Sequence, residues 1–177
     1  NCLIDEWIRR NKKGNYDSNG QLASLGKTNK LILDQALEDY ENIPTKNINS
    51  FDVNDFEINF LRGLDLQDGA STITDFTSYI IANKLLKVIL RYNKKISRII
   101  LCGGGRKNKT LIHRIERDSH NKLKFETSDH YGVDGDFVES QAFAYLAIRS
   151  FLNLPITFPN TTGCKLPSTG GVLVKNF

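Results

Sequence analysis

IILCGGGRKNKTLIHRI, the stretch from Ile99 to Ile115, decides the fold of this chain. A short apolar run leads directly into the glycines Gly103 to Gly105, and an amphipathic segment follows Asn108. This order predicts a strand, a glycine turn and a helix. Glycine lacks Cβ, so a flat or anionic ligand can approach the backbone closely, and the next helix offers it unpaired N–H groups. The turn therefore suits a nucleotide, although plain tight turns also contain triple glycines.

Two familiar nucleotide motifs are missing from the sequence. No string fits the P-loop pattern G-x-x-x-x-G-K-[ST]. The dinucleotide pattern G-x-G-x-x-G fails because Asn108 stands where its third glycine belongs. The turn therefore holds a pyrophosphate in neither of these ways, which leaves the adenine or ribose of a nucleotide as its candidate ligand.

Length and composition are those of one globular domain or one lobe of a larger protein. The chain has 177 residues, of which 40% are hydrophobic and 25% are charged. No apolar run approaches the ~20 residues that cross a bilayer, and the amphipathic start is unlike a signal peptide. Methionine is absent, including at position 1. We therefore expect that position 1 is not the translation start and that the chain is part of a larger fold.

Charge, cysteines and histidines exclude several functions. The net charge is +4, and no aromatic residues interleave with the basic clusters at 9–13 and 91–98. These clusters indicate solvated helix ends rather than a nucleic-acid partner. Three cysteines, Cys2, Cys102 and Cys164, are odd in number and far apart, so they indicate neither a zinc site nor a disulfide framework and fit a reducing cytoplasm best. The separations of His113, His120 and His130 do not suggest metal ligation.

Apolar spacing and turn residues predict mostly helices, with few strands. We expect a loop at 15–26, an irregular segment at 42–50, and a closing loop and tail at 155–177. The predicted helices are 3–10, 30–40 with Asn29 as its cap, 54–64, 72–92, the segment after the glycines, and 137–152. The predicted strands are 96–102, apolar enough to be central in a sheet, and 123–126. Strand, glycine turn, helix and strand in this order indicate an α/β fold.

One acidic group is a second candidate site. Asp136 stands where the last long helix needs an N-cap, and Glu139 follows at the capping-box position. Alternatively, Glu139 lies beside an alanine-rich face that we expect to be buried, with Val138, Ala142, Tyr145, Leu146 and Phe151 inside. A buried carboxylate needs hydrogen-bonding partners, and the hydroxyls of a polar ligand would provide them. Both interpretations stay open.

The order of these motifs resembles the C-terminal part of the anhydro-N-acetylmuramic acid kinases. The matching stretches are GGG followed by Asn108, the G-[IV]-D step at Gly132 to Asp134, and the E-[AS]-x-A-F-A-x-L-A helix from Glu139 to Ala147. NCLIDEWI at the start resembles the end of the family's D-T-G-P-G-N-x-L-[IL]-D-x-W stretch. Thr162 to Cys164 is similar to its closing T-G-A. The resemblance therefore spans nearly the whole chain.

The resemblance implies a fold and an activity. The fold would be the C-terminal lobe of an actin-like ATPase (ribonuclease H-like), α/β, helix-rich and with a small mixed sheet. Residues 1–177 would form a single nucleotide-contacting lobe of a two-lobed kinase. Such a kinase uses ATP and Mg²⁺ in cytoplasmic cell-wall recycling, although no Mg²⁺ ligands are identifiable here. Water opens the ring of 1,6-anhydro-N-acetylmuramic acid while the γ-phosphoryl group goes to O6, giving N-acetylmuramic acid 6-phosphate.

Site residues and partners follow from the same resemblance. Gly103, Gly104 and Gly105 would hold the adenosine side, with Asn108 as a polar contact. Asn1 would lie at the end of the phosphate loop, and Glu139 would face the sugar cleft or orient its neighbours. The implied partners are the anhydro-sugar, a missing N-terminal lobe and a candidate homodimer, with neither nucleic acid nor membrane.

The chain also departs from the family pattern. The phosphate-binding G-T-S-x-D-G segment is absent, and the general base, the Asp that opens D-T-G-P-G-N, would precede Asn1. The family's PPKS-like segment is PTKN here, Pro44 to Asn47. We therefore expect that the chain alone is not a competent kinase. The alternatives are a non-catalytic nucleotide-binding or assembly lobe of the same superfold, and another sugar kinase.

Overall fold

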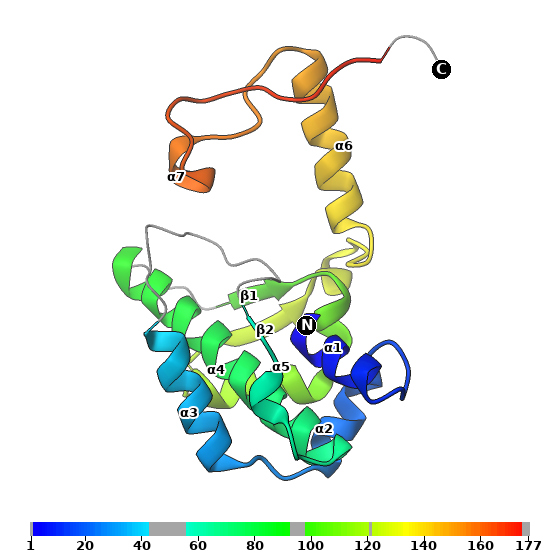
Figure 1. Ribbon diagram of the computed structural model, residues 1–177. Helices are drawn as coiled ribbons and strands as arrows, with labels where there is room; N and C mark the ends of the chain where they lie inside the picture. The colour runs from blue at the N-terminus through cyan, green and yellow to red at the C-terminus, as the bar shows by residue number, and fades with distance from the viewer. Residues whose placement is uncertain (1, 43–55, 93–97, 121, 175–177) are drawn as a thin grey trace. The chain divides into compact units, whose positions relative to one another are not determined.

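The computed structural model describes residues 2–42, 56–92, 98–120 and 122–174 (Figure 1). The chain divides into two compact units. The described residues up to Gly135 form the first unit, which contains the glycine turn, and those from Asp136 onward belong to the second. The single lobe over 1–177 stays a prediction.

Helices dominate the first unit. Its α-helices are α1 (Cys2–Arg10), α2 (Gln21–Leu25), α3 (Lys30–Glu41), α4 (Leu66–Tyr92) and α5 (Lys109–Asp118). Its strands are β1 (Arg98–Leu101) and β2 (Lys124–Thr127), and its 3₁₀ turns are η1 (Ser18–Gly20), η3 (Asn59–Leu61), η4 (Gly104–Lys107) and η5 (Ser128–Tyr131). The second unit contains α6 (Val138–Phe151) and α7 (Pro159–Thr162). Most predicted elements are confirmed within a few residues.

The glycine turn stands inside a β-α-β unit. β1 pairs with β2 in parallel, with Arg98 opposite Lys124 and Leu101 opposite Thr127. Parallel neighbours need a crossover, and α5 provides it between the two strands. The sheet of the described residues is therefore parallel rather than mixed. Strand β1 is therefore not central as expected, because the sheet of the described residues has two strands and Ile100 of β1 is 56% exposed.

Helix α4 organises the core of the first unit. It packs against α1, α2, α3 and α5. Gly69 permits the close approach of α1, because an added Cβ would lie 2.1 Å from the Trp7 ring. The Trp7 indole N–H also donates to the Leu66 carbonyl at 2.9 Å. The core is built mainly from buried aliphatic and aromatic side chains: Leu3, Ile4, Trp7, Ile8, Leu61, Ile73, Phe76, Leu111 and Ile115.

Three sequence predictions about helices are wrong. Helix α2 and η1 occupy the predicted loop at 15–26, and the described end of the predicted helix at 54–64 is only the short turn η3. Helix α4 begins at Leu66, six residues before the predicted start at Thr72, because Asp65 accepts from the Asp68 amide at 2.8 Å. Thr72 therefore lies inside the helix, where its hydroxyl donates to the Asp68 carbonyl at 2.7 Å.

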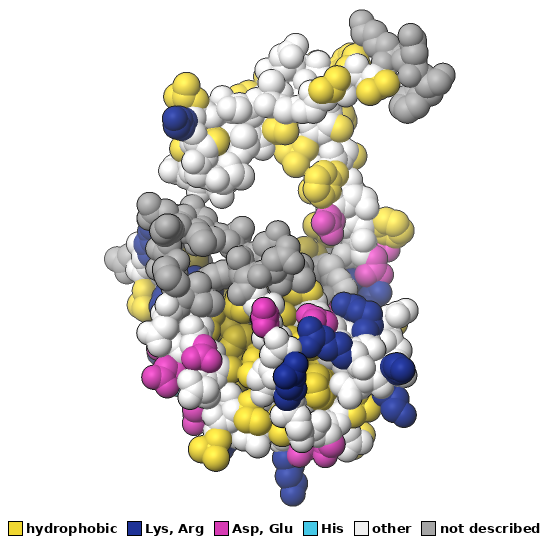
Figure 2. All heavy atoms as spheres, viewed as in Figure 1, with side chains coloured by type: hydrophobic (Ala, Val, Ile, Leu, Met, Phe, Trp, Pro, Cys, Tyr) yellow, Lys and Arg dark blue, Asp and Glu magenta, His cyan; other side chains and the backbone are white. Residues whose placement is uncertain are grey.

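Helix α6 is exposed, contrary to the prediction of a buried face. None of its residues is buried, and the alanines of the expected inner face, Ala142, Ala144 and Ala147, are exposed. Tyr145 and Phe151 are 58% and 67% exposed. Figure 2 shows such hydrophobic side chains at the surface of the second unit. The physical reason is that, among the described residues of the second unit, little besides the chain that follows this helix is available to cover it.

A membrane-crossing helix was not found: none in the described part of the chain is both long and apolar enough.

Candidate functional site

The glycine turn has a conformation that only glycine adopts without strain. Gly103 has φ +74° and ψ 176°, and it leads into η4. Asn108 then caps α5, because its Oδ1 accepts from the Leu111 amide at 2.9 Å. Asn108 is only 5% exposed, and its Nδ2 makes no hydrogen bond that the described residues show. Its amide NH₂ is therefore the group that a ligand would use.

The turn borders a pocket of about 500 Å³. Gly104, Gly105 and Asn108 form one wall, as the sequence predicts for a ligand turn. The opposite walls come from α1 and from the segment before α2, and their residues are Cys2, Asp5, Tyr16, Asp17 and Asn19, with Lys107 from η4. An added Cβ at Gly103 or Gly104 would meet nothing within 4 Å, so the backbone of the turn is open to a ligand.

Sequence reasoning missed the two carboxylates of this pocket. Asp17 is buried and accepts from the backbone amides of Leu22 at 2.9 Å and Ala23 at 3.0 Å, so it caps α2. The signal for it is the string DSNG, which is typical of a cap or turn. Asp5 makes no hydrogen bond with the described residues, and burial raises its pKa. The carboxylate of Asp5 is therefore the acceptor that remains for hydroxyl or amino groups of a ligand.

Close backbone packing fixes the segment before α2 against α5. Gly20 has φ +71°, and its carbonyl accepts from the Thr110 hydroxyl at 2.8 Å. A Cβ at Gly20 would lie 2.2 Å from Oδ1 of Asn108. The wall with Tyr16 and Asn19 and the wall with the glycines are therefore parts of one packed assembly.

Arg106 connects the glycine turn to the loop after β2. Its Nε lies 2.7 Å from Oδ2 of Asp129, and its Nη2 lies 3.0 Å from Oδ1 of the same carboxylate. Its Nη1 donates to the Gly103 carbonyl at 3.0 Å. The hydrogen bonds from Arg106 are the main reason that the pKa of Asp129 falls from its usual value near 3.8 to about 2.

This pKa gives an acid-pH prediction. Because the folded pKa lies below the unfolded one, Asp129 stabilises the fold above pH ~4, and this contribution is lost as the pH falls through about 2. In Arg106→Gln, the midpoint of the Asp129 titration should rise toward the usual pKa near 3.8. Carboxyl ¹³C NMR of Asp129 against pH measures it, with Arg10→Gln on α1 as the control. An unchanged titration midpoint in Arg106→Gln would contradict the assignment of the lowered Asp129 pKa to Arg106.

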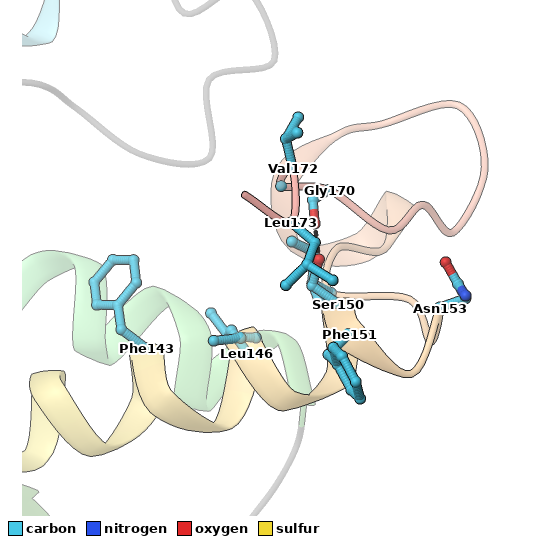
Figure 3. A pocket seen from close by; sticks show the side chains of 11 residues that line it. Phe143, Leu146, Ser150, Phe151, Asn153, Gly170, Val172 and Leu173 are labelled. Atoms are coloured by element: carbon cyan, nitrogen blue, oxygen red, sulfur yellow. Dashed lines mark hydrogen bonds between the residues drawn. The ribbon is translucent and has the colours of Figure 1, made fainter. Parts of the chain in front are cut away.

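A second cavity, of about 590 Å³, lies within the second unit. Phe143, Leu146 and Phe151 line it from α6, and Val172 and Leu173 line it from the C-terminal segment (Figure 3). None of its lining residues carries a charge, so no cation is present there to pair with a phosphate group. Glu139 does not line it and is exposed on the first turn of α6.

The predicted capping role of Asp136 is wrong, and two other predictions lie outside the described residues. Phe137 holds the N-cap position of α6, without a side-chain cap. This removes the capping-box partner proposed for Glu139. Asn1 and the PTKN segment, Pro44 to Asn47, lie outside the described residues. The structure thus brings Gly104, Gly105 and Asn108 together in one pocket and leaves Glu139 in the other unit.

Comparison with known proteins decides the family. A family model described as anhydro-N-acetylmuramic acid kinase matches residues 1–176. The chain belongs to this family. It is 51% identical over its whole length to the anhydro-N-acetylmuramic acid kinase of Pelagibacter ubique, of which it covers 47%. Enzymes of the same name from Zymomonas mobilis and Brucella canis are each 35% identical, over 97% and 99% of this chain and 45% and 46% of their own lengths.

The chain therefore spans about half the length of the curated anhydro-N-acetylmuramic acid kinases that it matches. Membership of a kinase family implies the use of ATP. The backbone of the glycine turn has open space beside it that could receive part of a nucleotide. The described residues contain no group of three or more His, Cys, Asp or Glu placed to hold a metal ion, and Mg²⁺ stays a prediction.

Proposed function

We propose that this chain is the nucleotide-binding part of an anhydro-N-acetylmuramic acid kinase that works in the cytoplasm. The observation that carries the proposal is the open glycine turn at a 500 Å³ pocket, in a chain that matches the family over residues 1–176. The whole enzyme would open 1,6-anhydro-N-acetylmuramic acid and phosphorylate its O6 to give N-acetylmuramic acid 6-phosphate. A homodimer stays a prediction.

The reaction balances with one water molecule. Water forms a bond to the anomeric carbon, the bond from that carbon to O6 breaks, and O6 takes the γ-phosphoryl group as ADP leaves. A general base must accept a proton from the water. Positioning and stabilisation of charge carry most of such a transfer. ATP supplies the phosphoryl group when it is bound.

The residues of this chain would bind and orient the nucleotide. Gly104 and Gly105 let the adenosine lie against the backbone, and Nδ2 of Asn108 donates a hydrogen bond to it. Asp5 would accept from its hydroxyl or amino groups, because a partly buried carboxylate gains from such donors. Glu139 stays a proposed residue of the sugar cleft in the complete enzyme.

The main alternative is a non-catalytic lobe that binds a nucleotide or assembles with other proteins. The match to the anhydro-N-acetylmuramic acid kinase family over residues 1–176 favours it over a different sugar kinase. The two functions differ in what happens when the rest of the enzyme is supplied, because only an enzyme part would restore turnover.

The test measures binding and turnover separately. We expect the purified chain to bind a fluorescent ATP analogue but to form no ADP with ATP and the anhydro-sugar. Addition of the part of the Pelagibacter ubique enzyme that the chain does not match should start ADP formation, with N-acetylmuramic acid 6-phosphate as the product by mass spectrometry. Rapid turnover by the chain alone would show that it is complete. Binding without turnover in the mixture would support the non-catalytic lobe.

A further inference from the structure

Arg106 is a buried cation that lies outside the apolar core cluster of the first unit. Its side chain is only 6% exposed, although it belongs to the short turn η4. Asp129 binds it through both carboxylate oxygens, at 2.7 Å and 3.0 Å. A bidentate pair of this kind fixes the plane of the guanidinium group, so it defines geometry as well as charge. Asp134 adds a longer ion pair at 3.8 Å.

Gly135 closes the same arrangement from the other side. Its carbonyl accepts from the Gly103 amide at 2.8 Å, while the Gly103 carbonyl accepts from Arg106 at 3.0 Å. Both backbone polar groups of Gly103 are thus held. A Cβ at Gly135 would lie 2.4 Å from Nε of Arg106, so only glycine leaves room for the guanidinium group. Arg106, Asp129 and Gly135 together are called the latch below.

The latch joins the two loops that follow the parallel strands. Gly103 follows β1, and Asp129 follows β2. Ligands of parallel α/β sheets bind at the carboxyl ends of the strands, where these two loops lie. The side chain of Asp129 is 44% exposed, and an ion pair with one such solvent-exposed partner adds little net stability. Its position at this edge, away from the core residues of α1 and α4, indicates that it serves the geometry of the turn.

We propose that Arg106 is a positioning residue for the nucleotide: with Asp129 and Gly135, it holds Gly103 so that Gly104 and Gly105 stay open to the ligand. This inference rests on the proposed function of the pocket. It also gives the G-V-D-G stretch at 132–135 a role that needs no contact with a substrate. Gly135 leaves space for an arginine of the neighbouring loop. Asp129, whose pKa is lowered to about 2, remains charged at neutral pH and keeps the latch closed.

The test compares latch variants by three measurements on the 177-residue chain. Arg106→Gln removes the cation, Arg106→Lys keeps the charge without the bidentate geometry, and Gly135→Ala displaces the guanidinium group without a change of charge. Arg10→Gln, on a surface pair with Glu6, is the matched control. The measurements are the affinity for a fluorescent ATP analogue, hydrogen exchange at the Gly103 amide, and the melting temperature.

Each latch variant should weaken nucleotide binding by about tenfold or more, with Arg106→Lys the mildest, while the melting temperature changes by less than about 4 °C. Exchange at the Gly103 amide should rise in the same variants and stay unchanged in Arg10→Gln. Unchanged affinity together with faster exchange would reduce the latch to a structural contact and overturn the proposal. Unchanged exchange would show that no latch exists. If the unmodified chain binds no ATP analogue, the proposed function itself fails, whatever the exchange data show.

Discussion

Gly104→Val should abolish nucleotide binding while leaving the fold intact. Gly104 has no positive φ, and an added Cβ there meets nothing within 4 Å, so the backbone accepts a side chain without strain. The branched side chain would instead occupy the pocket that Gly104 lines. We expect the affinity for an ATP analogue to fall about 100-fold, which corresponds to about 2.7 kcal/mol. Isothermal titration calorimetry measures it.

The choice of glycine matters for this experiment. Gly103 has φ +74°, so any substitution there strains the backbone and mixes loss of binding with loss of stability. Ser24→Val on the exposed side of α2 is the matched control, since it adds the same side chain outside the pocket. The free energy of unfolding of Gly104→Val should change by less than about 1 kcal/mol. Retained affinity in this variant would remove the glycine turn from the nucleotide site.

Local chemistry explains what the sequence predicts correctly about the site. An apolar run, three glycines and an amphipathic segment require only neighbouring residues to form a strand, a turn and a helix, and β1, η4 and α5 confirm them. The cap by Asn108 is equally local, because its side chain reaches the amide three residues later. The same holds for Asn29 at the start of α3. Such features depend on spacing along the chain and can be predicted from it.

The residues that sequence reasoning missed depend on contacts between distant segments. Asp5 belongs to the pocket only because α1 and the segment before α2 pack beside the glycine turn. Arg106 and Asp129 are 23 residues apart, and nothing in their spacing indicates a pair. The prediction about α6 failed for the opposite reason. Its apolar periodicity indicates a face that is suited to burial, but periodicity does not name the partner, and the second unit leaves that face exposed.

A buried polar network between α4 and α5 explains why hydroxyl-rich residues occur inside the core. The Arg114 guanidinium lies 3.1 Å from Oδ1 of Asp75 and donates to the Ser71 carbonyl at 2.6 Å and the Ala23 carbonyl at 3.0 Å. Arg117 reaches the same Asp75 oxygen at 2.8 Å. Burial lowers the pKa of Arg114, while the charge of Asp75 opposes this effect. Arg114 therefore ties three segments together in a place where polar groups need partners.

Arg114→Met should destabilise the first unit by about 3 kcal/mol. The side chain of Arg114 is 12% exposed, and its loss removes the side-chain donor to the Ser71 and Ala23 carbonyls. Arg117→Met is the matched control: Arg117 is 54% exposed and shares the same carboxylate, so its loss should cost only about 1 kcal/mol. Urea unfolding at neutral pH gives both values, provided that the slope of the unfolding free energy against urea concentration is the same in all variants.

A double-mutant cycle separates the ion pair from the backbone contacts of Arg114. In an Asp75→Asn background, Arg114→Met should cost less than in the unmodified chain, and the difference is the coupling between the two side chains. The loss of unfolding free energy that remains in the Asp75→Asn background measures the hydrogen bonds from Arg114 to the carbonyls of Ser71 and Ala23. Equal losses for Arg114→Met and Arg117→Met would contradict the network, because the buried and the half-exposed arginine would then contribute alike.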